Sequence, residues 1–162
     1  MMAIVTRNNL KPGDIGIIVQ LHGVLYAEEC GLDYTFEAYV AGPLSEFALS
    51  PDKEKQRLWI VEMDGVVIGS LAIVRISSSE AQLRWFLLHP KARSKGFGKH
   101  LMEEAIEFSR NAGYERIILW TFNKLETAIA LYKRYGFEKT DEKTHTIWGR
   151  LITEEKYELT LV

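Results

Sequence analysis

The residues best suited to chemistry lie in one short basic loop between an apolar stretch and an amphipathic one. Four cations surround two glycines, Gly96 and Gly98: they are Lys91, Arg93, Lys95 and Lys99. Glycine has no Cβ, so a ligand can come close to the backbone there. A helix that begins at such a loop leaves several backbone N–H groups unpaired, and these groups favour an anion. The pattern therefore predicts a site for a polyphosphate ligand.

Two common phosphate motifs do not match this loop. A dinucleotide fingerprint needs a third glycine three residues after Gly98, and that position holds Leu101. A P-loop needs a glycine five residues before Gly98 and a Ser or Thr after Lys99, but the chain has Arg93 and His100 there. Both nucleotide motifs are excluded.

The loop must be positioned by the strand before it and the helix after it. Residues 81–88 form an apolar run in which Arg84 interrupts the stretch from Leu83 to Leu88, and this predicts a central strand buried on both faces. Residues 98–111 carry apolar side chains on one helical face. Residues 116–121 form a second short buried strand, so strand, helix and strand predict a right-handed parallel crossover.

Upstream of this crossover, residues 14–20 predict a first strand and residues 22–29 a helix. Asp33 is a candidate N-cap for a further helix, which we expect Pro43 to interrupt. Residues 58–63 and 66–75 predict two strands joined by a hairpin at Asp64-Gly65.

Downstream, Asn123 and Glu126 predict a capping box that opens a last helix, and Gly136 ends that helix. Two final strands follow. The expectation is one domain, residues 1–162, with a mixed α/β sheet of about seven strands and about four helices.

The composition excludes several classes of protein. A length of 162 residues with 47% hydrophobic content suits a single globular domain, and a net charge of −2 gives no general attraction to nucleic acid or membrane. The single cysteine, Cys30, excludes an internal disulfide and a cysteine-rich metal site. Because no apolar run approaches the length of a membrane span, we expect a soluble cytoplasmic protein. From the cysteine count and the net charge we expect neither a metal nor a nucleic-acid partner.

Two motifs together resemble the GNAT N-acetyltransferase family. Arg93-x-x-Gly96-x-Gly98 is similar to the Arg/Gln-x-x-Gly-x-Gly/Ala signature of that family. Ala128-x-x-Leu131-Tyr132-x-x-x-Gly136-Phe137 is similar to its last helix and following strand. The resemblance spans roughly residues 58–162. More narrowly, the chain resembles acetyltransferase domains fused behind MarR-type regulators, although these 162 residues leave no room for the winged-helix half.

The resemblance implies a GNAT-type acyl-CoA N-acyltransferase fold, acetyl-CoA as donor and a primary amine as acceptor. It implies that the loop amides hold the pyrophosphate and that the end of the preceding strand pairs with the pantetheine arm. The implied cofactor residues are Phe86, Leu87, Leu88, Arg93, Ser94, Lys95, Gly96, Phe97, Gly98, Lys99 and Asn123. Many family members carry Asn where this chain has Leu125, so Asn123 either substitutes for that residue or only caps the helix.

The implied reaction is direct attack of the amine on the thioester, with one proton leaving the amine and one reaching the thiolate. Tyr132 holds the position of the family's general acid, although the same spacing suits a core aromatic. The candidate bases are His22, Glu29 and His145, and for each of them a surface or hydrogen-bonded structural role is the alternative. Arg84 could bind an acceptor carboxylate or pair with a protein carboxylate. Tyr26 and Trp85 are further candidates for the acceptor pocket.

The sequence leaves the acceptor open among small-molecule amines, amino acids and amines of peptides or proteins. A second hypothesis is an acyl-CoA-binding sensor without catalytic activity. A homodimer is compatible with the resemblance, but the sequence identifies no interface.

Overall fold

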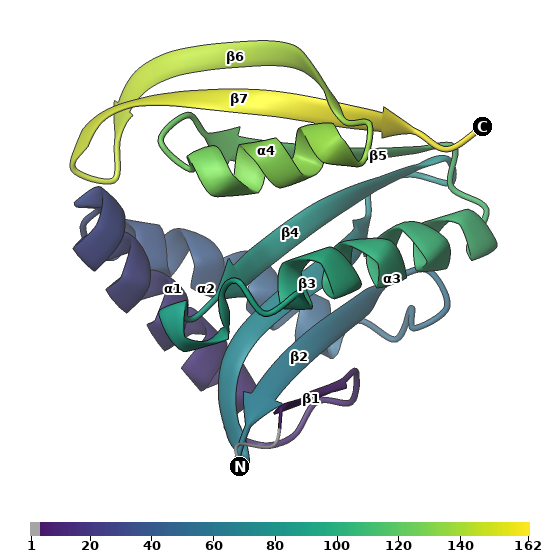
Figure 1. The fold of residues 1–162 in the computed structure, drawn as a ribbon, viewed down its shortest axis with the longest axis horizontal. Helices are drawn as coiled ribbons and strands as arrows, with labels where there is room; N and C mark the ends of the chain where they lie inside the picture. Colours follow the sequence, from purple (N-terminus) through teal and green to yellow (C-terminus); the bar gives the residue numbers. More distant parts are fainter. Residues whose placement is uncertain (1–3) are drawn as a thin grey trace.

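A mixed seven-stranded sheet runs through the protein in the order β1-β2-β3-β4-β5-β7-β6 (Figure 1). The structure is a computed structural model that describes residues 4–162, and residues 1–3 of the predicted domain lie outside that range. The strands are β1 (Ile4–Arg7), β2 (Arg57–Met63), β3 (Val66–Arg75), β4 (Glu80–Leu88), β5 (Arg116–Phe122), β6 (Glu138–Ile147) and β7 (Arg150–Thr160). The pair β4 and β5 is parallel and the other pairs are antiparallel. The predicted mixed α/β fold is confirmed.

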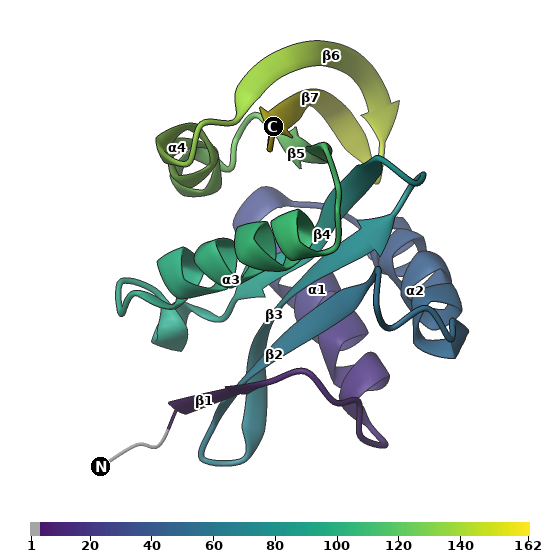
Figure 2. The same cartoon turned by 90° about the vertical axis from the view of Figure 1, so that its right-hand side faces the viewer.

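Helices cover both faces of the sheet (Figure 2). On one face lie α1 (Asp14–Cys30) and α2 (Tyr34–Leu49); on the other lie α3 (Phe97–Asn111) and α4 (Glu126–Arg134). A short 3₁₀ turn, η1 (Pro90–Ala92), follows β4. Alternate strand residues form two separate cores, as period-two side-chain placement requires.

The sheet opens between its two central strands. The pairing of β4 with β5 runs only from Glu80 to Gln82, opposite Arg116 to Ile118. Beyond Gln82 the strands diverge (Figure 1), and residues 83–88 have no pairing partner on β5 among the described residues. The end of β4 therefore offers an unpaired backbone edge to a ligand.

A β-bulge lies in this same part of β4. Arg84 pairs with Ala72 and Leu87 pairs with Ser70, so two residues of β4 face one residue of β3. Trp85 sits in the bulge with φ 50°, and its carbonyl accepts a hydrogen bond of 2.7 Å from the buried Ser70 hydroxyl. The bulge turns Trp85 toward the core beneath α1 and α2, whereas Leu83 packs in the core on the other face.

Two predictions for the N-terminal part of the chain are wrong. The predicted strand at residues 14–20 is the first part of α1, and the first strand is β1. The apolar run there could not distinguish helix from strand, and long-range contacts decide: Asp14 is buried and binds Arg7 of β1 through two hydrogen bonds of 2.8 Å. Pro43 does not interrupt α2. The carbonyl that loses its partner belongs to Tyr39, which is 43% exposed, so water can hydrogen-bond it.

The predicted capping box at Asn123 is also wrong. Helix α4 begins at Glu126 with Leu125 as its N-cap, and the backbone N–H of Asn123 instead donates to the Thr153 carbonyl of β7 at 3.0 Å. Two other local predictions are confirmed. The Asp33 carboxylate accepts a hydrogen bond from the Thr35 N–H, and the Asp64-Gly65 turn joins β2 to β3.

Candidate active site

An open cleft of about 800 Å³, called here the outer cleft, lies among the end of β4, the basic loop, α1 and α4. Eight of the predicted cofactor residues line it: Phe86, Leu87, Leu88, Arg93, Ser94, Gly96, Gly98 and Lys99. Three do not line it, namely Lys95, Phe97 and Asn123. The structure thus brings most of the predicted loop residues together with the unpaired edge of β4.

The N-terminus of α3 faces the outer cleft. The first backbone hydrogen bond of this helix runs from the His100 N–H to the Gly96 carbonyl at 3.0 Å, so the amides of residues 97–99 precede the helical ladder. Gly96 enters the helix with φ 85°. A Cβ on Gly98 would lie 3.5 Å from Phe86 and Leu131 and would narrow the cleft. These free backbone N–H groups, next to glycines that let a ligand come close, suit the phosphates of an anionic ligand.

The N-terminus of α4 also lines the outer cleft, through residues 124–128. Its first backbone hydrogen bond joins the Ile129 N–H to the Leu125 carbonyl at 3.0 Å. The sequence predicted a helix start near this point but not that it lines the cleft, and it missed the cleft-lining cations Lys124 and Arg134. The sequence does show that Lys124 and Arg134 are cations at the two ends of this helix. Only the divergence of β4 and β5 in the structure shows that they line the same cleft as the basic loop.

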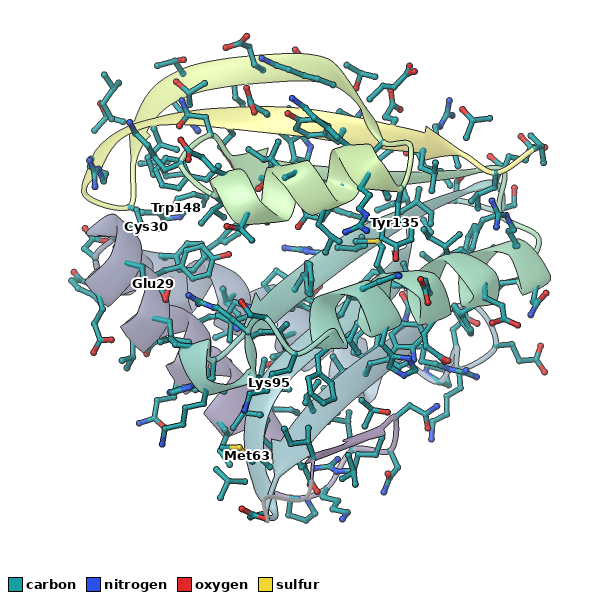
Figure 3. All side chains as sticks on the ribbon, viewed as in Figure 1. Glu29, Cys30, Met63, Lys95, Tyr135 and Trp148 are labelled. Carbon is teal, nitrogen blue, oxygen red and sulfur yellow. The ribbon has the colours of Figure 1, made fainter. Side chains whose placement is uncertain are left out.

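Arg93 fixes the loop to the rest of the cleft. Its Nε donates to the Leu88 carbonyl at 2.9 Å, and its Nη2 donates to both oxygens of Glu29 at 2.7 and 3.1 Å. Figure 3 shows Glu29 and Cys30 at the end of α1 and Lys95 on the loop before α3. The charges of Arg93 and Glu29 therefore satisfy each other, and the ion pair ties α1 to the strand end.

A smaller inner cavity of about 120 Å³ adjoins the outer cleft. Four residues line both spaces: Tyr26, Phe86, Leu125 and Ala128. Aromatic side chains from α1, α2, β4, β5, α4 and the β6–β7 turn, where Figure 3 labels Trp148, form about half of the lining of the inner cavity. A ligand whose chain follows the cleft can thus place its end beside the cavity.

Tyr132 lines the inner cavity from α4, and the end of that helix fixes its position. The Phe137 N–H donates to the Tyr132 carbonyl at 3.1 Å and the Gly136 N–H donates to Lys133 at 3.1 Å, with Gly136 at φ 94°. This is a Schellman motif, and the Tyr132 and Phe137 rings pack with centroids 5.8 Å apart. Burial raises the pKa of Tyr132, so the hydroxyl stays protonated. Within residues 4–162 it has no hydrogen-bond partner.

His22 lines the inner cavity from α1 and is 3% exposed. Its Nδ1 lies 2.8 Å from the Ile18 carbonyl, so this nitrogen carries the proton and donates it. The other nitrogen, Nε2, is a buried acceptor without a partner among the described residues. Burial lowers the pKa of His22 to about 4, which keeps the ring neutral near pH 7.

His145 does not line either space, whereas its partner Glu154 lines the inner cavity. The His145 Nε2 lies 2.6 Å from the Glu154 Oε2, and the Glu154 residue is buried. Sequence reasoning proposed His145 and missed Glu154, because the pairing of β6 with β7 decides which of the two faces the cavity.

Arg84 and Trp85 both line the inner cavity. The guanidinium carbon of Arg84 lies 4.9 Å from the Trp85 ring centre and 5.8 Å from that of Tyr39. Among the carboxylates of residues 4–162, none forms an ion pair with Arg84. The Trp85 Nε1 is buried and has no hydrogen-bond partner in the described part of the chain.

The structure also bears on metal and membrane binding. The described residues contain no group of three or more His, Cys, Asp and Glu side chains that could hold a metal ion. From residue 4 to residue 162, no helix is long and apolar enough to cross a bilayer.

Comparison with known proteins gives a consistent result. A family model described as "Acetyltransferase (GNAT) family" matches residues 25–137. The uncharacterized N-acetyltransferase YjgM of Escherichia coli is 38% identical over 86 residues, covering 51% of this chain and 52% of YjgM. Human N-acetyltransferase 8B is 29% identical over 99 residues, covering 58% of this chain and 44% of its own length. The chain thus spans about half the length of these curated relatives.

Solved structures share the fold over the whole chain. YncA of Salmonella typhimurium, solved with acetyl-CoA, superimposes with a TM-score of 0.73 at 16% identity, covering 99% of this chain and 95% of YncA. At this identity the likeness concerns the fold alone.

Proposed function

The chain belongs to the acetyltransferase (GNAT) family, and on that premise we propose that it transfers the acetyl group of acetyl-CoA to a primary amine. One observation carries the proposal: the outer cleft, which two helix N-termini line, adjoins an inner cavity that holds Tyr132 and His22. A donor site and an acceptor site thus meet at the four residues that line both spaces.

Acetyl-CoA supplies the acetyl group as a thioester, and the outer cleft holds it. The amides at residues 97–99 and those at the start of α4 bind its phosphates, with Lys99 and Arg134 nearby. The open edge at residues 86–88 pairs with the pantetheine arm. Arg93 acts by holding the loop in place, because its hydrogen bonds go to Leu88 and Glu29.

Transfer proceeds directly, without a covalent intermediate on the protein. The acceptor nitrogen bonds to the acetyl carbon as the carbon–sulfur bond breaks. The amine proton passes to the His22 Nε2, and the Tyr132 hydroxyl gives a proton to the departing sulfur. Both side chains then exchange their protons with solvent, which restores the starting state.

His22 is the best-supported of the three base candidates. It lines the inner cavity, and its Nε2 is an acceptor without a hydrogen-bond partner among the described residues. Glu29 already pairs with Arg93, and His145 reaches the cavity only through Glu154. Tyr26 positions the acceptor at the junction, because it lines both spaces and stacks on His22 with ring centroids 6.0 Å apart.

The test measures two quantities separately. Calorimetry measures acetyl-CoA binding, and release of free thiol with a panel of primary amines measures transfer. We expect binding, and transfer to at least one amine that Tyr132→Phe slows strongly and Tyr135→Phe slows little, because the Tyr135 hydroxyl donates to Glu103 and lines neither space. Binding without thiol release for every amine would instead support a sensor. The resemblance to MarR-fused domains, a homodimer and a cytoplasmic location stay predictions.

A further inference from the structure

Three side chains of the inner cavity have unused hydrogen-bonding capacity. Arg84 has no ion-pair partner among the described carboxylates, and the buried Trp85 Nε1 and His22 Nε2 have no hydrogen-bond partners in residues 4–162. Buried polar groups in folded proteins are nearly always satisfied by the protein, by water or by a ligand, so a ligand of this cavity can pair with the two buried nitrogens and with the half-buried Arg84 guanidinium. That ligand must accept hydrogen bonds at one place and donate one at another.

Arg84 and Trp85 set the first requirement. Both are donors, they are consecutive in β4, and the guanidinium carbon lies 4.9 Å from the indole ring centre. The guanidinium lies over the indole ring and both residues line the cavity, so a carboxylate suits them, since its two oxygens can accept from both donors. The bulge produces this arrangement, because an unbroken strand would point the two side chains to opposite faces.

His22 sets the second requirement. Its Nδ1–H is committed to the Ile18 carbonyl, so its free Nε2 is an acceptor. The N–H of an amine fits that atom. A chain of ring contacts joins the two ends of the cavity: Tyr26 stacks on His22, Phe36 on Tyr26, and Tyr39 lies between Phe36 and the Arg84 guanidinium.

The walls and the size of the cavity set a third requirement. Phe36 packs against Trp148 at a centroid distance of 5.0 Å, and Tyr39 packs against Trp148 at the same distance. The volume of about 120 Å³ is well below the roughly 300–1,000 Å³ of sites for drug-sized ligands. The cavity therefore suits a small molecule with an apolar side chain.

We propose that the acceptor is a free α-amino acid with an apolar side chain, whose carboxylate binds Arg84 and the Trp85 indole N–H while its amine faces His22. This inference rests on the proposed acetyl transfer and specifies its acceptor. A lysine side chain or the N-terminus of a protein lacks a free carboxylate beside its amine. Such acceptors would leave Arg84 and Trp85 unsatisfied.

The experiment compares matched acceptors with the 162-residue chain. The rate of thiol release from acetyl-CoA is measured with L-leucine, L-methionine, L-phenylalanine and L-tryptophan, and with the amide and the decarboxylated amine of each. We expect kcat/KM to be roughly 10- to 100-fold higher for the acids, as for loss of a hydrogen bond to a charged group. Equal or higher rates without the carboxylate would overturn the inference and leave the acetyltransferase proposal standing.

Substitutions of Arg84 and Trp85 test whether these two residues cause the preference for acceptors with a carboxylate. Arg84→Gln should raise the KM for the amino acid roughly 10-fold or more, leave acetyl-CoA binding unchanged and abolish the preference for the acid over the amide. Trp85→Phe should weaken the preference in the same direction. Arg57→Gln is the matched control, because Arg57 also stacks on aromatic rings, at 4.5 Å from the Phe108 centre, but lines neither space.

If acetyl-CoA binds but no thiol is released, calorimetry measures whether the four amino acids bind to the CoA-loaded protein. Binding that Arg84→Gln removes would support the acceptor site while the transfer proposal fails. Absence of binding by all four amino acids would overturn the inference.

Discussion

Arg84 and Trp85 are consecutive residues of β4, yet both side chains line the same cavity, with the guanidinium carbon 4.9 Å from the indole ring centre. The cause is the bulge at Trp85, whose carbonyl is held by the Ser70 hydroxyl. Ser70→Ala should leave that buried carbonyl without its partner and lower the free energy of unfolding by about 1–3 kcal/mol. It should also raise the acceptor KM without changing acetyl-CoA binding.

Ser109→Ala is the control for this prediction. Ser109 is equally buried and also donates from its hydroxyl to a carbonyl, that of Ala105, but this carbonyl lies within a regular helix. Urea denaturation and acceptor kinetics of both variants check the difference. A Ser109→Ala effect on acceptor KM as large as that of Ser70→Ala would show that the bulge has no special role.

Tyr132→Phe should lower kcat roughly 100-fold or more, as expected for loss of a general acid. The ring packing on Phe137 and Phe86 is retained, and the hydroxyl has no hydrogen-bond partner in residues 4–162, so stability should stay within about 0.5 kcal/mol. Steady-state kinetics with thiol detection and thermal unfolding measure the two effects. Full turnover by Tyr132→Phe would remove the assignment of this residue as acid.

His22 should make stability depend on pH. Burial lowers its pKa from 6.5 to about 4, so between these values the unfolded chain binds a proton that the folded protein does not. Stability should therefore be complete above about pH 6.5 and fall as the pH drops toward 4, by roughly 3 kcal/mol. The difference between wild type and His22→Asn, measured by urea denaturation at pH 7.5 and pH 4.5, isolates this group from the carboxylates.

The Asn side chain can still donate to the Ile18 carbonyl but cannot act as a base. Transfer by His22→Asn should therefore fall strongly at pH 7.5, where its fold is intact. An unchanged kcat together with an unchanged pH profile would assign the base elsewhere.

Gly98→Ala should weaken acetyl-CoA binding about 10-fold while the protein stays folded. A Cβ at this position makes ordinary van der Waals contacts at 3.5–3.6 Å with Phe86, Leu131 and Leu88, but it occupies the floor of the outer cleft. Calorimetry with acetyl-CoA measures the effect. Gly16→Ala is the control, because a Cβ there, on α1, meets nothing within 4 Å. Equal affinity in the two variants would contradict the placement of the phosphates at α3.

Arg7→Met should destabilise the protein by about 3–5 kcal/mol, because it leaves the buried Asp14 carboxylate without its cation. Hydrogen bonds from Arg7 lower the pKa of Asp14, so the wild-type contribution should be present above the usual carboxyl range and be lost in acid. Arg75→Met is the control: its ion pair with Asp52 is exposed and 3.3 Å long, and its removal should cost under about 1 kcal/mol. Denaturant titration compares the two losses.

Features that depend on a few adjacent residues could be predicted from the sequence. The Asp64-Gly65 hairpin, the Asp33 cap and the glycine loop before α3 all appear as expected. The Tyr132 to Phe137 motif also proved to be a local structure, a Schellman motif that fixes the orientation of the tyrosine. Turn and cap geometries are set by short-range sterics and hydrogen bonds, which is why their residue types identify them.

The errors occurred where distant contacts choose between local alternatives. The apolar run at residues 14–20 is compatible with the periodicity of a helix or of a strand. The ion pair between Arg7 and Asp14 forms in the structure in which Asp14 is the first residue of helix α1. Asn123 is a suitable cap by type, but pairing of its N–H with β7 moves the helix start to Glu126.

The sequence by itself determined the family resemblance, the class of fold and most of the residues that line the outer cleft. Only the tertiary structure decided which side chains share the inner cavity. Arg84, Trp85 and His22 come from separate elements or, by simple alternation, from opposite faces of one strand. They meet because the bulge in β4 turns the Trp85 side chain to the face on which Arg84 lies, and because β4 and β5 separate beyond Gln82. Both features depend on the packing of the whole chain.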